Sequence, residues 1–176
     1  PDTLELTELP DPAPGPGQVV VAVKGCAINY PDVLIIEDKY QFKPPRPFAP
    51  GGEISGTIES IGEGVEGWQV GDRVMVPFNV FCGTCYFCNH ELPGHCENSN
   101  PDHYGPEGGL LTEKGGALFG YTDLYGGYNG GQAEYVRVPY ADVGPLKVPD
   151  GLTDEQVLFL TDIFPTGWQA AVYCDI

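Results

Sequence analysis

The sequence predicts a mainly β fold with short helices, formed by one domain that spans residues 1–176. Composition is the first observation: glycine (25) and proline (18) are abundant, yet 41% of residues are hydrophobic, which favours a turn-rich packed fold over disorder. Patterning is the second: short β-branched or alternating segments recur along the chain, and extended helical patterns begin only near residue 150. A chain of this length can bury about 70% of its unfolded surface.

The expected strands are separated by turns rich in glycine and proline. Residues 1–17 fit a strand followed by a rigid turn, and Pro31 ends any helix before Asp32, after which a short helical turn can form. Apolar or alternating patterns predict further strands, and these lie at residues 18–24, 54–60, 72–77 and 133–139.

A helical segment is expected to close the domain, from about residue 152 to residue 176. Thr153 and Gln156 have the spacing of a capping box, with acidic residues between them that suit a helix N-terminus. Thr166 begins a second segment with the same capping pattern. The β region is therefore followed by helices, and the chain is expected to continue beyond Ile176.

Four of the six cysteines lie close together in a glycine-containing and proline-containing lobe of residues 78–103. Their spacing is C-x2-C-x2-C-x7-C, which lets the loop present four thiolates to one Zn²⁺. Two disulfides are the alternative, although C-x2-C spacing strains a bridge within one loop. Three nearby histidines could replace a thiolate but are expected to be solvated, namely His90, His95 and His103. The predicted ligands are Cys82, Cys85, Cys88 and Cys96.

A zinc ion held by four sulfurs has no open position for water or substrate. The predicted zinc is therefore structural, and it is expected to contribute on the order of 10 kcal/mol to a lobe that has little core of its own.

The charge of the chain argues against two classes of partner. Eight Lys and Arg against 25 Asp and Glu give a net charge of −17, which repels both nucleic acids and anionic membrane surfaces. No apolar run approaches 18 residues and no signal-peptide pattern is present, so we expect a cytoplasmic protein that does not enter membranes.

Residues 62–67 match the dinucleotide-binding pattern G-x-G-x-x-G, but their context argues against that function. The phosphate-binding form of this motif needs a helix directly after the glycines, whereas residues 68–72 lead into another predicted strand. Glu63 and Glu66 would also face the phosphates. A turn between strands is the expected structure, so no nucleotide-binding motif remains in the chain.

Taken together, these residues resemble the GroES-like catalytic domain of the medium-chain dehydrogenases/reductases, the superfamily of zinc alcohol dehydrogenases and quinone reductases. The resemblance covers nearly the whole chain and is carried by PGPGQVVV, GGEISGTIESIGEGVEGWQVGDRV, the four-cysteine lobe, GGQAEYVRVPYAD and LTDIFPTGW. It implies a GroES-like β-barrel with a zinc-binding lobe, a small-molecule substrate, NAD or NADP as coenzyme, and possible homo-oligomers. The Rossmann coenzyme domain of this superfamily is absent from residues 1–176.

Two branches of the superfamily are combined in the sequence. The region from Pro77 onward resembles zinc-dependent formaldehyde and alcohol dehydrogenases, whereas CAINYPDVLIIEDKYQFKPP resembles zinc-free quinone and enoyl-thioester reductases. By resemblance, a catalytic zinc would take ligands at the positions of Asn29, Gly52 and Asp162. An amide, a position without a side chain and one carboxylate do not make a Zn²⁺ site, so we expect no catalytic zinc.

Three other side chains near these positions have open roles. Cys26 could offer a thiolate but is more simply a small buried residue, and Cys174 is expected to be packed or to lie at the edge of the domain. Glu53 could bind a metal or pair with Arg46 or Arg73.

The resemblance also implies the residues of the reaction pocket. Asn29, Tyr30 and Asp32 would line it, with Tyr30 donating a hydrogen bond to a substrate oxygen, and Asp162 would lie across the same cleft. Thr166 and Gly167 match positions beside the nicotinamide ring. Simpler alternatives are an aromatic plug for Tyr30, helix capping for Thr166 and a buried, hydrogen-bonded carboxylate for Asp162.

Two functions are consistent with these residues. The first is the catalytic-domain portion of an NAD(P)-dependent alcohol dehydrogenase-like oxidoreductase, which transfers hydride to or from a carbonyl or activated alkene and is inactive without its coenzyme domain. The alternative is a non-catalytic or engineered scaffold stabilised by zinc. A zinc-finger nucleic-acid binder would need basic charge that the sequence lacks.

Overall fold

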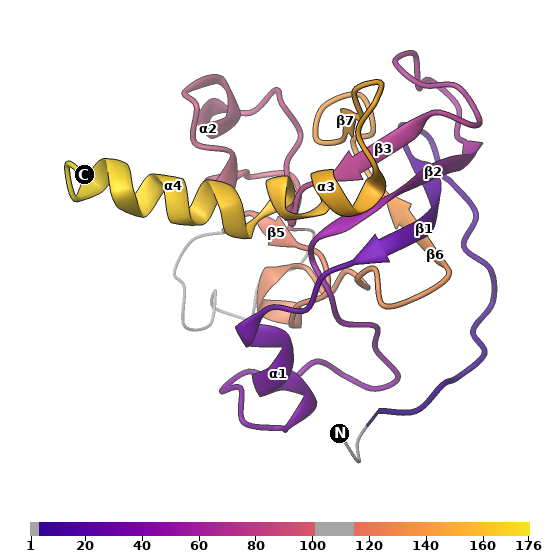
Figure 1. Cartoon of the computed structure of the whole chain (residues 1–176). Helices are drawn as coiled ribbons and strands as arrows, with labels where there is room; N and C mark the ends of the chain where they lie inside the picture. Colours follow the sequence, from indigo (N-terminus) through magenta and orange to yellow (C-terminus); the bar gives the residue numbers. More distant parts are fainter. Residues whose placement is uncertain (1–3, 101–114) are drawn as a thin grey trace.

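The computed structural model describes residues 4–100 and 115–176, and an antiparallel five-stranded sheet forms their centre (Figure 1). Its strand order is β6-β1-β2-β3-β7, and each neighbouring pair is antiparallel. A separate two-stranded sheet pairs β4 with β5. The strands are β1 (Val19–Cys26), β2 (Ile54–Ile61), β3 (Arg73–Val76), β4 (Asn79–Val80), β5 (Ala117–Leu118), β6 (Tyr135–Val138) and β7 (Leu146–Lys147).

The helices are short, and the longest of them, α4, has 11 residues. The α-helices are α1 (Tyr30–Ile36), α2 (Tyr86–Asn89), α3 (Asp154–Leu158) and α4 (Ile163–Tyr173). Single 3-10 turns are η1 (Pro93–His95), η2 (Asp123–Tyr125) and η3 (Phe159–Thr161). The predicted fold class, mainly β with short helices, is confirmed.

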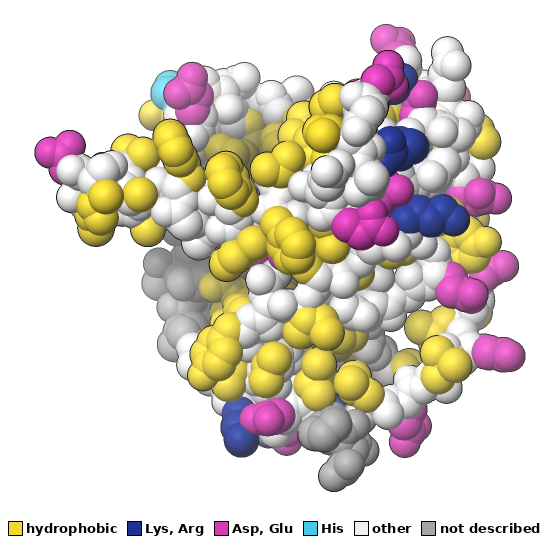
Figure 2. Space-filling view, viewed as in Figure 1, with side chains coloured by type: hydrophobic (Ala, Val, Ile, Leu, Met, Phe, Trp, Pro, Cys, Tyr) yellow, Lys and Arg dark blue, Asp and Glu magenta, His cyan; other side chains and the backbone are white. Residues whose placement is uncertain are grey.

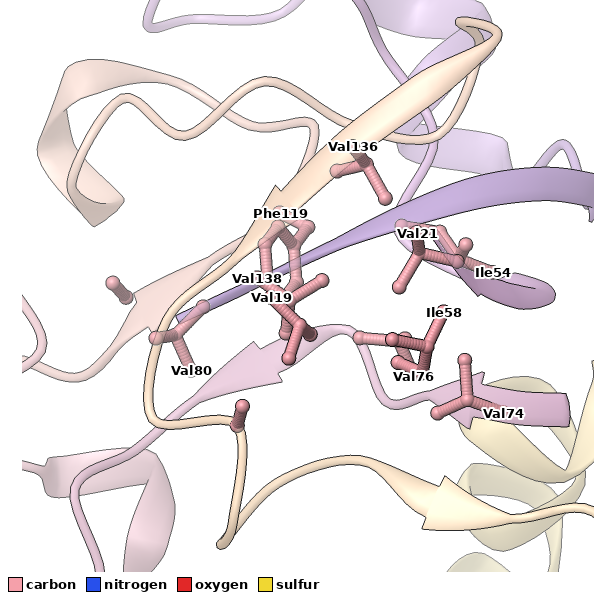
Figure 3. Packing of buried hydrophobic residues seen from close by; sticks show 12 residues of the cluster. Val19, Val21, Ile54, Ile58, Val74, Val76, Val80, Phe119, Val136 and Val138 are labelled. Atoms are coloured by element: carbon pink, nitrogen blue, oxygen red, sulfur yellow. The ribbon is translucent and has the colours of Figure 1, made fainter. Parts of the chain in front are cut away.

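The main core lies between the strands that the sequence predicts best. β1 and β2 pair in a register that places Val21 opposite Ile58, and both side chains are buried (Figure 3). Gly56 allows the close approach of these strands, because a Cβ atom there would come within 2.3 Å of the Ala22 carbonyl oxygen. The buried residues of this cluster are Val19, Val21, Ile54, Ile58, Val74, Val76, Val80, Ala117, Phe119, Val136, Val138 and Ala141.

The predicted capping box begins α3. The Thr153 hydroxyl oxygen accepts a hydrogen bond from the Gln156 backbone N–H at 3.3 Å, and the Gln156 side chain accepts one from the Thr153 N–H at 2.9 Å. Val157 then packs with Met75 of β3 in a second small cluster. This contact fixes the helical end of the chain against the sheet.

Other expectations need correction. Within the described residues before β1, no strand forms: only Gly17 and Gln18 make backbone hydrogen bonds to other segments, with Gly62 and Glu63 just after β2 and Ala141 after β6. Thr166 does not begin a helix: α4 starts at Ile163, so Thr166 lies inside its first turn. α1 is a seven-residue helix rather than a single turn, with Pro31 in its first turn, where a missing N–H is tolerated.

The glycine-rich segment 62–67 links β2 to β3, and no helix follows it before residue 73. The dinucleotide reading of this motif is therefore rejected, as the sequence predicted. Among the helices of the described residues, none is both long and apolar enough to cross a membrane.

α4 extends away from the sheet toward the C-terminus, and none of its residues is buried (Figure 1). Hydrophobic side chains follow the length of this helix on the visible face (Figure 2). The exposed apolar residues on it are Ile163, Phe164, Trp168, Val172 and Tyr173.

Candidate functional site

Four cysteine sulfurs meet in the lobe between β4 and the 3-10 turn η1. Cys82 follows β4, Cys85 is the N-cap of α2, Cys88 lies within α2 and Cys96 follows η1. All four sulfurs lie within 4.8 Å of one another, and the Cys82–Cys88 and Cys85–Cys96 sulfur pairs are both 4.0 Å apart.

This geometry fits a tetrahedral zinc ion. Zn–S bonds of about 2.3 Å place the sulfurs of a tetrahedral site roughly 3.8 Å apart, close to the two measured separations. Each of the four cysteines is free, so the alternative of two disulfides is not formed. The predicted ligand set is therefore brought together, and a zinc ion held there would supply cross-linking of the lobe rather than a reactive position.

Hydrogen bonds to sulfur stabilise thiolates in the lobe. Cys82 Sγ accepts from the Thr84 N–H at 3.4 Å and from Asn98 Nδ2 at 3.3 Å. Burial acts to raise the pKa of Cys82, but hydrogen bonds from the Thr84 hydroxyl, the Thr84 and Cys85 N–H groups and the Asn98 amide outweigh it and lower the pKa to about 5. Burial raises the pKa of Cys88 to about 12, helped by the adjacent Cys85 sulfur. A divalent cation would favour the thiolate form at all four positions.

Neither of the two described histidines of the lobe joins the cysteine cluster. His90 stacks on the Tyr86 ring, its Nδ1 lies 2.7 Å from the Tyr86 carbonyl oxygen, and the side chain is exposed. His95 is also exposed and packs near the Phe87 ring. His103 lies outside the described residues.

A second site lies where α1, β2 and the start of α4 meet. A small cavity of about 40 Å³ is lined by polar and aromatic side chains from segments far apart in the sequence. Its lining residues are Asn29, Pro31, Asp32, Gly52, Phe78, Leu118, Phe119, Tyr121 and Asp162. Asn29, Asp32 and Asp162, three of the four residues that the sequence assigned to catalysis, are thus brought together.

Asp32 is held by backbone donors on both sides. Its carboxylate oxygens accept hydrogen bonds from the Asn29 N–H at 2.7 Å and the Gly51 N–H at 3.0 Å. Burial nevertheless raises the pKa of Asp32, and the nearby charges of Asp162 and Glu53 act in the same direction. The cavity is therefore rich in acidic groups.

Glu53 is fully buried beside this cavity, and its partners differ from those that the sequence suggested. Its Oε2 accepts from Asn29 Nδ2 at 2.9 Å and its Oε1 accepts from the Ile163 N–H at 2.8 Å. The expected arginine partners are engaged elsewhere: Arg46 lies 3.2 Å from Asp38, and Arg73 lies 3.2 Å from Asp154.

The tyrosine that lines the cavity is Tyr121 and not Tyr30, which the sequence had assigned to the reaction pocket. Tyr30 is 74% exposed and is not among the residues that line the cavity, so its assigned role stays a prediction. Tyr121 lines the cavity instead, with its hydroxyl oxygen 2.7 Å from that of Tyr40. The Tyr121 ring also contacts Tyr125 edge to face at 5.2 Å. No local sequence pattern links residues 40 and 121, so this contact could not be predicted from the sequence.

Asp162 and Thr166 are joined within the first turn of α4. The Thr166 hydroxyl donates to Asp162 Oδ1 at 3.0 Å, and its N–H donates to the Asp162 carbonyl oxygen at 2.9 Å. An open hollow of about 430 Å³ lies beside this turn, and Thr166 is one of its lining residues. It is lined by Phe78, Pro165, Thr166, Gln169, Ala170 and Tyr173, whereas Gly167 is exposed on the same helix.

Cys26 and Gly52 both have closely packed surroundings. Cys26 is partly buried, and burial raises the pKa of its thiol to about 12. A Cβ atom on Gly52 would come within 3.1 Å of the Phe78 Cβ, so Phe78 occupies the space next to this position. Cys174, by contrast, is exposed near the end of the chain.

Comparison with known proteins gives a consistent result. The family model described as the alcohol dehydrogenase GroES-like domain matches residues 15–150. A probable zinc-binding alcohol dehydrogenase from Mycobacterium tuberculosis is 41% identical over 175 residues, which cover 99% of this chain and 40% of that protein. A glutathione-independent formaldehyde dehydrogenase from Pseudomonas aeruginosa is 44% identical over 126 residues, which cover 69% of this chain and 29% of that protein.

Solved structures agree with these relatives. An alcohol dehydrogenase from Thermus sp. ATN1 superposes with a TM-score of 0.75 at 28% identity, covering 97% of this chain and 42% of that one. A cobalt-bound and zinc-bound alcohol dehydrogenase from Pyrobaculum aerophilum gives a TM-score of 0.66 at 29% identity, with 89% and 41% covered. The chain thus spans less than half the length of the proteins it matches, and it belongs to the alcohol dehydrogenase GroES-like domain family, the N-terminal part of the medium-chain dehydrogenases/reductases.

Proposed function

We propose that the chain is the catalytic-domain portion of an NAD(P)-dependent oxidoreductase that transfers hydride to or from a carbonyl or activated alkene. Its substrate is a small molecule that enters beside Asn29, Asp32 and Asp162. The four-cysteine lobe holds a structural zinc, and the reaction pocket holds none. We further propose a cytoplasmic protein, since a reducing compartment keeps the four thiols available for zinc.

The observation that carries this proposal is the convergence of distant segments on one cavity. Asn29 and Asp32 begin α1, Gly52 precedes β2 and Asp162 precedes α4, yet all four line the same small space. Two carboxylates line it, the buried Asp32 and the partly buried Asp162, and such groups at one cavity are more common at reaction sites than elsewhere in a fold. The raised pKa of Asp32, caused first by burial, supports this choice of site.

We propose that α4 forms the part of the site that contacts the coenzyme. Thr166 lines the open hollow next to Phe78, and Gly167 follows it on an exposed helix. We propose that residues 1–176 form one GroES-like domain, with its zinc lobe at about 78–103 and its helical end at about 152–176. A Rossmann coenzyme domain would cover the apolar side chains that α4 exposes, and homo-oligomers would form mainly through that domain.

Roles can be assigned without a metal in the pocket. Asn29 and Asp32 would orient the substrate, and Tyr30 would donate a hydrogen bond to its oxygen when the coenzyme domain closes over α1. Asp162 would face the substrate from the opposite side, held by the Thr166 hydroxyl. The nicotinamide supplies the hydride, so the domain has to position the reacting atoms and exclude water.

The test joins this chain to the coenzyme domain of the Mycobacterium relative and measures NAD(P)H oxidation. The substrate panel contains a quinone, an enone, an enoyl thioester and small aldehydes, and the unjoined chain serves as the blank. We expect turnover on at least one class, reduced in Asp162→Asn but retained in Glu59→Gln, a matched change at an exposed position of β2. Turnover unchanged in Asp162→Asn would reject the assigned pocket.

A non-catalytic scaffold is the alternative, and the size of the cavity favours it. At about 40 Å³, the cavity is far smaller than the roughly 300–1,000 Å³ of a typical ligand pocket. If the joined protein is folded and binds NAD(P)H but turns over no substrate of the panel, the scaffold function is the better account.

A further inference from the structure

We propose that Glu53 is a positioning residue that caps α4 from outside the helix and thereby leaves the Asp162 carboxylate facing the cavity. The inference deepens the proposed function, since it concerns the same pocket and rests on Asp162 and α4 having the places assigned above. Its geometry, however, is testable in the 176-residue chain without any turnover.

The burial of Glu53 requires that its charge be compensated. The side chain is 0% exposed, and a buried carboxylate is strongly unfavourable unless hydrogen bonds satisfy its oxygens. Both oxygens have one donor: Asn29 Nδ2 at 2.9 Å and the Ile163 N–H at 2.8 Å. The donors are 24 and 110 positions away in sequence, so one side chain joins the start of α1 to the start of α4.

The contact with Ile163 has the character of a helix cap. Ile163 is the first residue of α4, and the first N–H groups of a helix have no partner within it. A carboxylate at this end also interacts favourably with the helix dipole. The residue that would normally provide the cap, Asp162, makes no side-chain cap hydrogen bond.

Because Glu53 serves as the cap, the Asp162 side chain is available for a different arrangement. Its Oδ1 accepts from the Thr166 hydroxyl at 3.0 Å, and Asp162 lines the cavity together with Asn29. Without Glu53, the Asp162 carboxylate would be expected to turn back onto the free N–H groups of α4. The pocket would then lose one of its acidic groups.

Asn29 supplies the second half of this arrangement, because its amide can donate to a charged Glu53 carboxylate. Among the described residues, the titratable groups that interact with Glu53 or Asp32 include Cys26 at the end of β1, Asp162 before α4 and Tyr121, and each is neutral or negative. An amide donates to Glu53 without adding charge, whereas a second carboxylate at this position would be repelled at 2.9 Å.

The experiment measures amide hydrogen exchange by NMR in the zinc-loaded 176-residue chain. In Glu53→Ala the Ile163 amide should exchange about tenfold faster than in the unmodified chain, as expected for loss of about one hydrogen bond to a charged group. The Val21 amide in β1 should be unchanged. In Glu53→Gln most of the protection should remain, because the Gln oxygen still accepts from Ile163 and its amide can bond the flipped Asn29 side chain. Glu59→Gln is the matched control.

Exchanging the amide and the carboxylate between positions 29 and 53 distinguishes capping of α4 by Glu53 from simple filling of space. Asn29→Asp should lose Ile163 protection at pH 8 and regain it toward pH 6, because two facing carboxylates can share a proton. The double variant Asn29→Asp/Glu53→Gln should restore protection at both pH values. Glu53→Gln, Asn29→Asp and the double variant keep the test valid even if Glu53→Ala does not fold.

The inference is overturned if Ile163 exchange is the same with and without the Glu53 carboxylate, or if the double variant protects no better than Asn29→Asp alone. In the joined protein, Glu53→Ala should raise the KM for NAD(P)H more than Glu53→Gln does. If exchange follows the predictions but no variant of the joined protein turns over, the proposed function fails and the capping role of Glu53 stands.

Discussion

The Cys82 N–H donates a hydrogen bond to the Cys96 sulfur at 3.3 Å, so the first and last cysteines of the lobe are in direct contact. Both side chains are buried, whereas Cys85 and Cys88 are partly exposed. The lobe therefore closes on itself at its base, with α2 carrying the outer pair of ligands. Donors that surround Cys82 prepare it to act as a thiolate ligand.

Replacing Asn98 with Ala should weaken zinc binding about 10- to 100-fold, the usual effect of removing a hydrogen bond to a metal ligand. The Asn98 amide is a direct donor to the Cys82 sulfur. Competition with a chromogenic chelator measures the affinity. Asn89→Ala is the control, because Asn89 lies in the same lobe but donates to the Thr84 carbonyl oxygen. Equal affinities of the two variants would argue against a role for Asn98 at the metal site.

Ile58→Ala should lower the free energy of unfolding by about 2–5 kcal/mol, since it removes a fully buried side chain from the main core. Glu59→Ala, at the next and exposed position of β2, should change it by less than about 0.5 kcal/mol. Urea denaturation of the zinc-loaded chain measures both. A small effect at Ile58 would mean that the register of β1 with β2 is not the one described.

Thr153→Ala should cost about 1 kcal/mol, because the Gln156 N–H at the start of α3 loses its acceptor. Thr153→Ser retains the hydroxyl and should preserve most of the stability. Thermal melts of the two variants provide the comparison, and similar melting temperatures would show that the capping box contributes nothing measurable.

Cys26 should react slowly with iodoacetamide at pH 8, because burial raises the pKa of its thiol to about 12 and the reactive thiolate is scarce. Below pH 12 the protonated thiol is favoured, so the rate of alkylation should keep rising about tenfold per pH unit from pH 8 to pH 10. Cys174, which is exposed, should be labelled first. Mass spectrometry after timed alkylation identifies the site, and rapid labelling of Cys26 at pH 8 would contradict its burial.

The sequence was informative wherever a local pattern sets the structure. The alternating side chains of β2 and the capping box at Thr153 depend on near neighbours, and both were predicted. The four-cysteine spacing was enough to predict the cluster of sulfurs, because two-residue gaps already bring thiolates together.

Contacts between distant segments were not predictable in the same way. Nothing local indicates that Glu53 would bond Ile163, 110 positions later, or that Tyr40 would meet Tyr121. The start of α4 was misplaced for the same reason, since its cap comes from Glu53 rather than from Thr166. A helix that is capped by another element leaves no capping pattern in its own sequence.

The number of zinc ions per chain tests the account most directly. Metal analysis of the purified protein should give one zinc, which is lost in Cys96→Ser and retained in Cys174→Ser, and loss of zinc should unfold the lobe. Two zinc ions per chain would place a metal in the pocket beside Asp162, and a chain that keeps its fold and stability without zinc would contradict the structural role of the four-cysteine lobe.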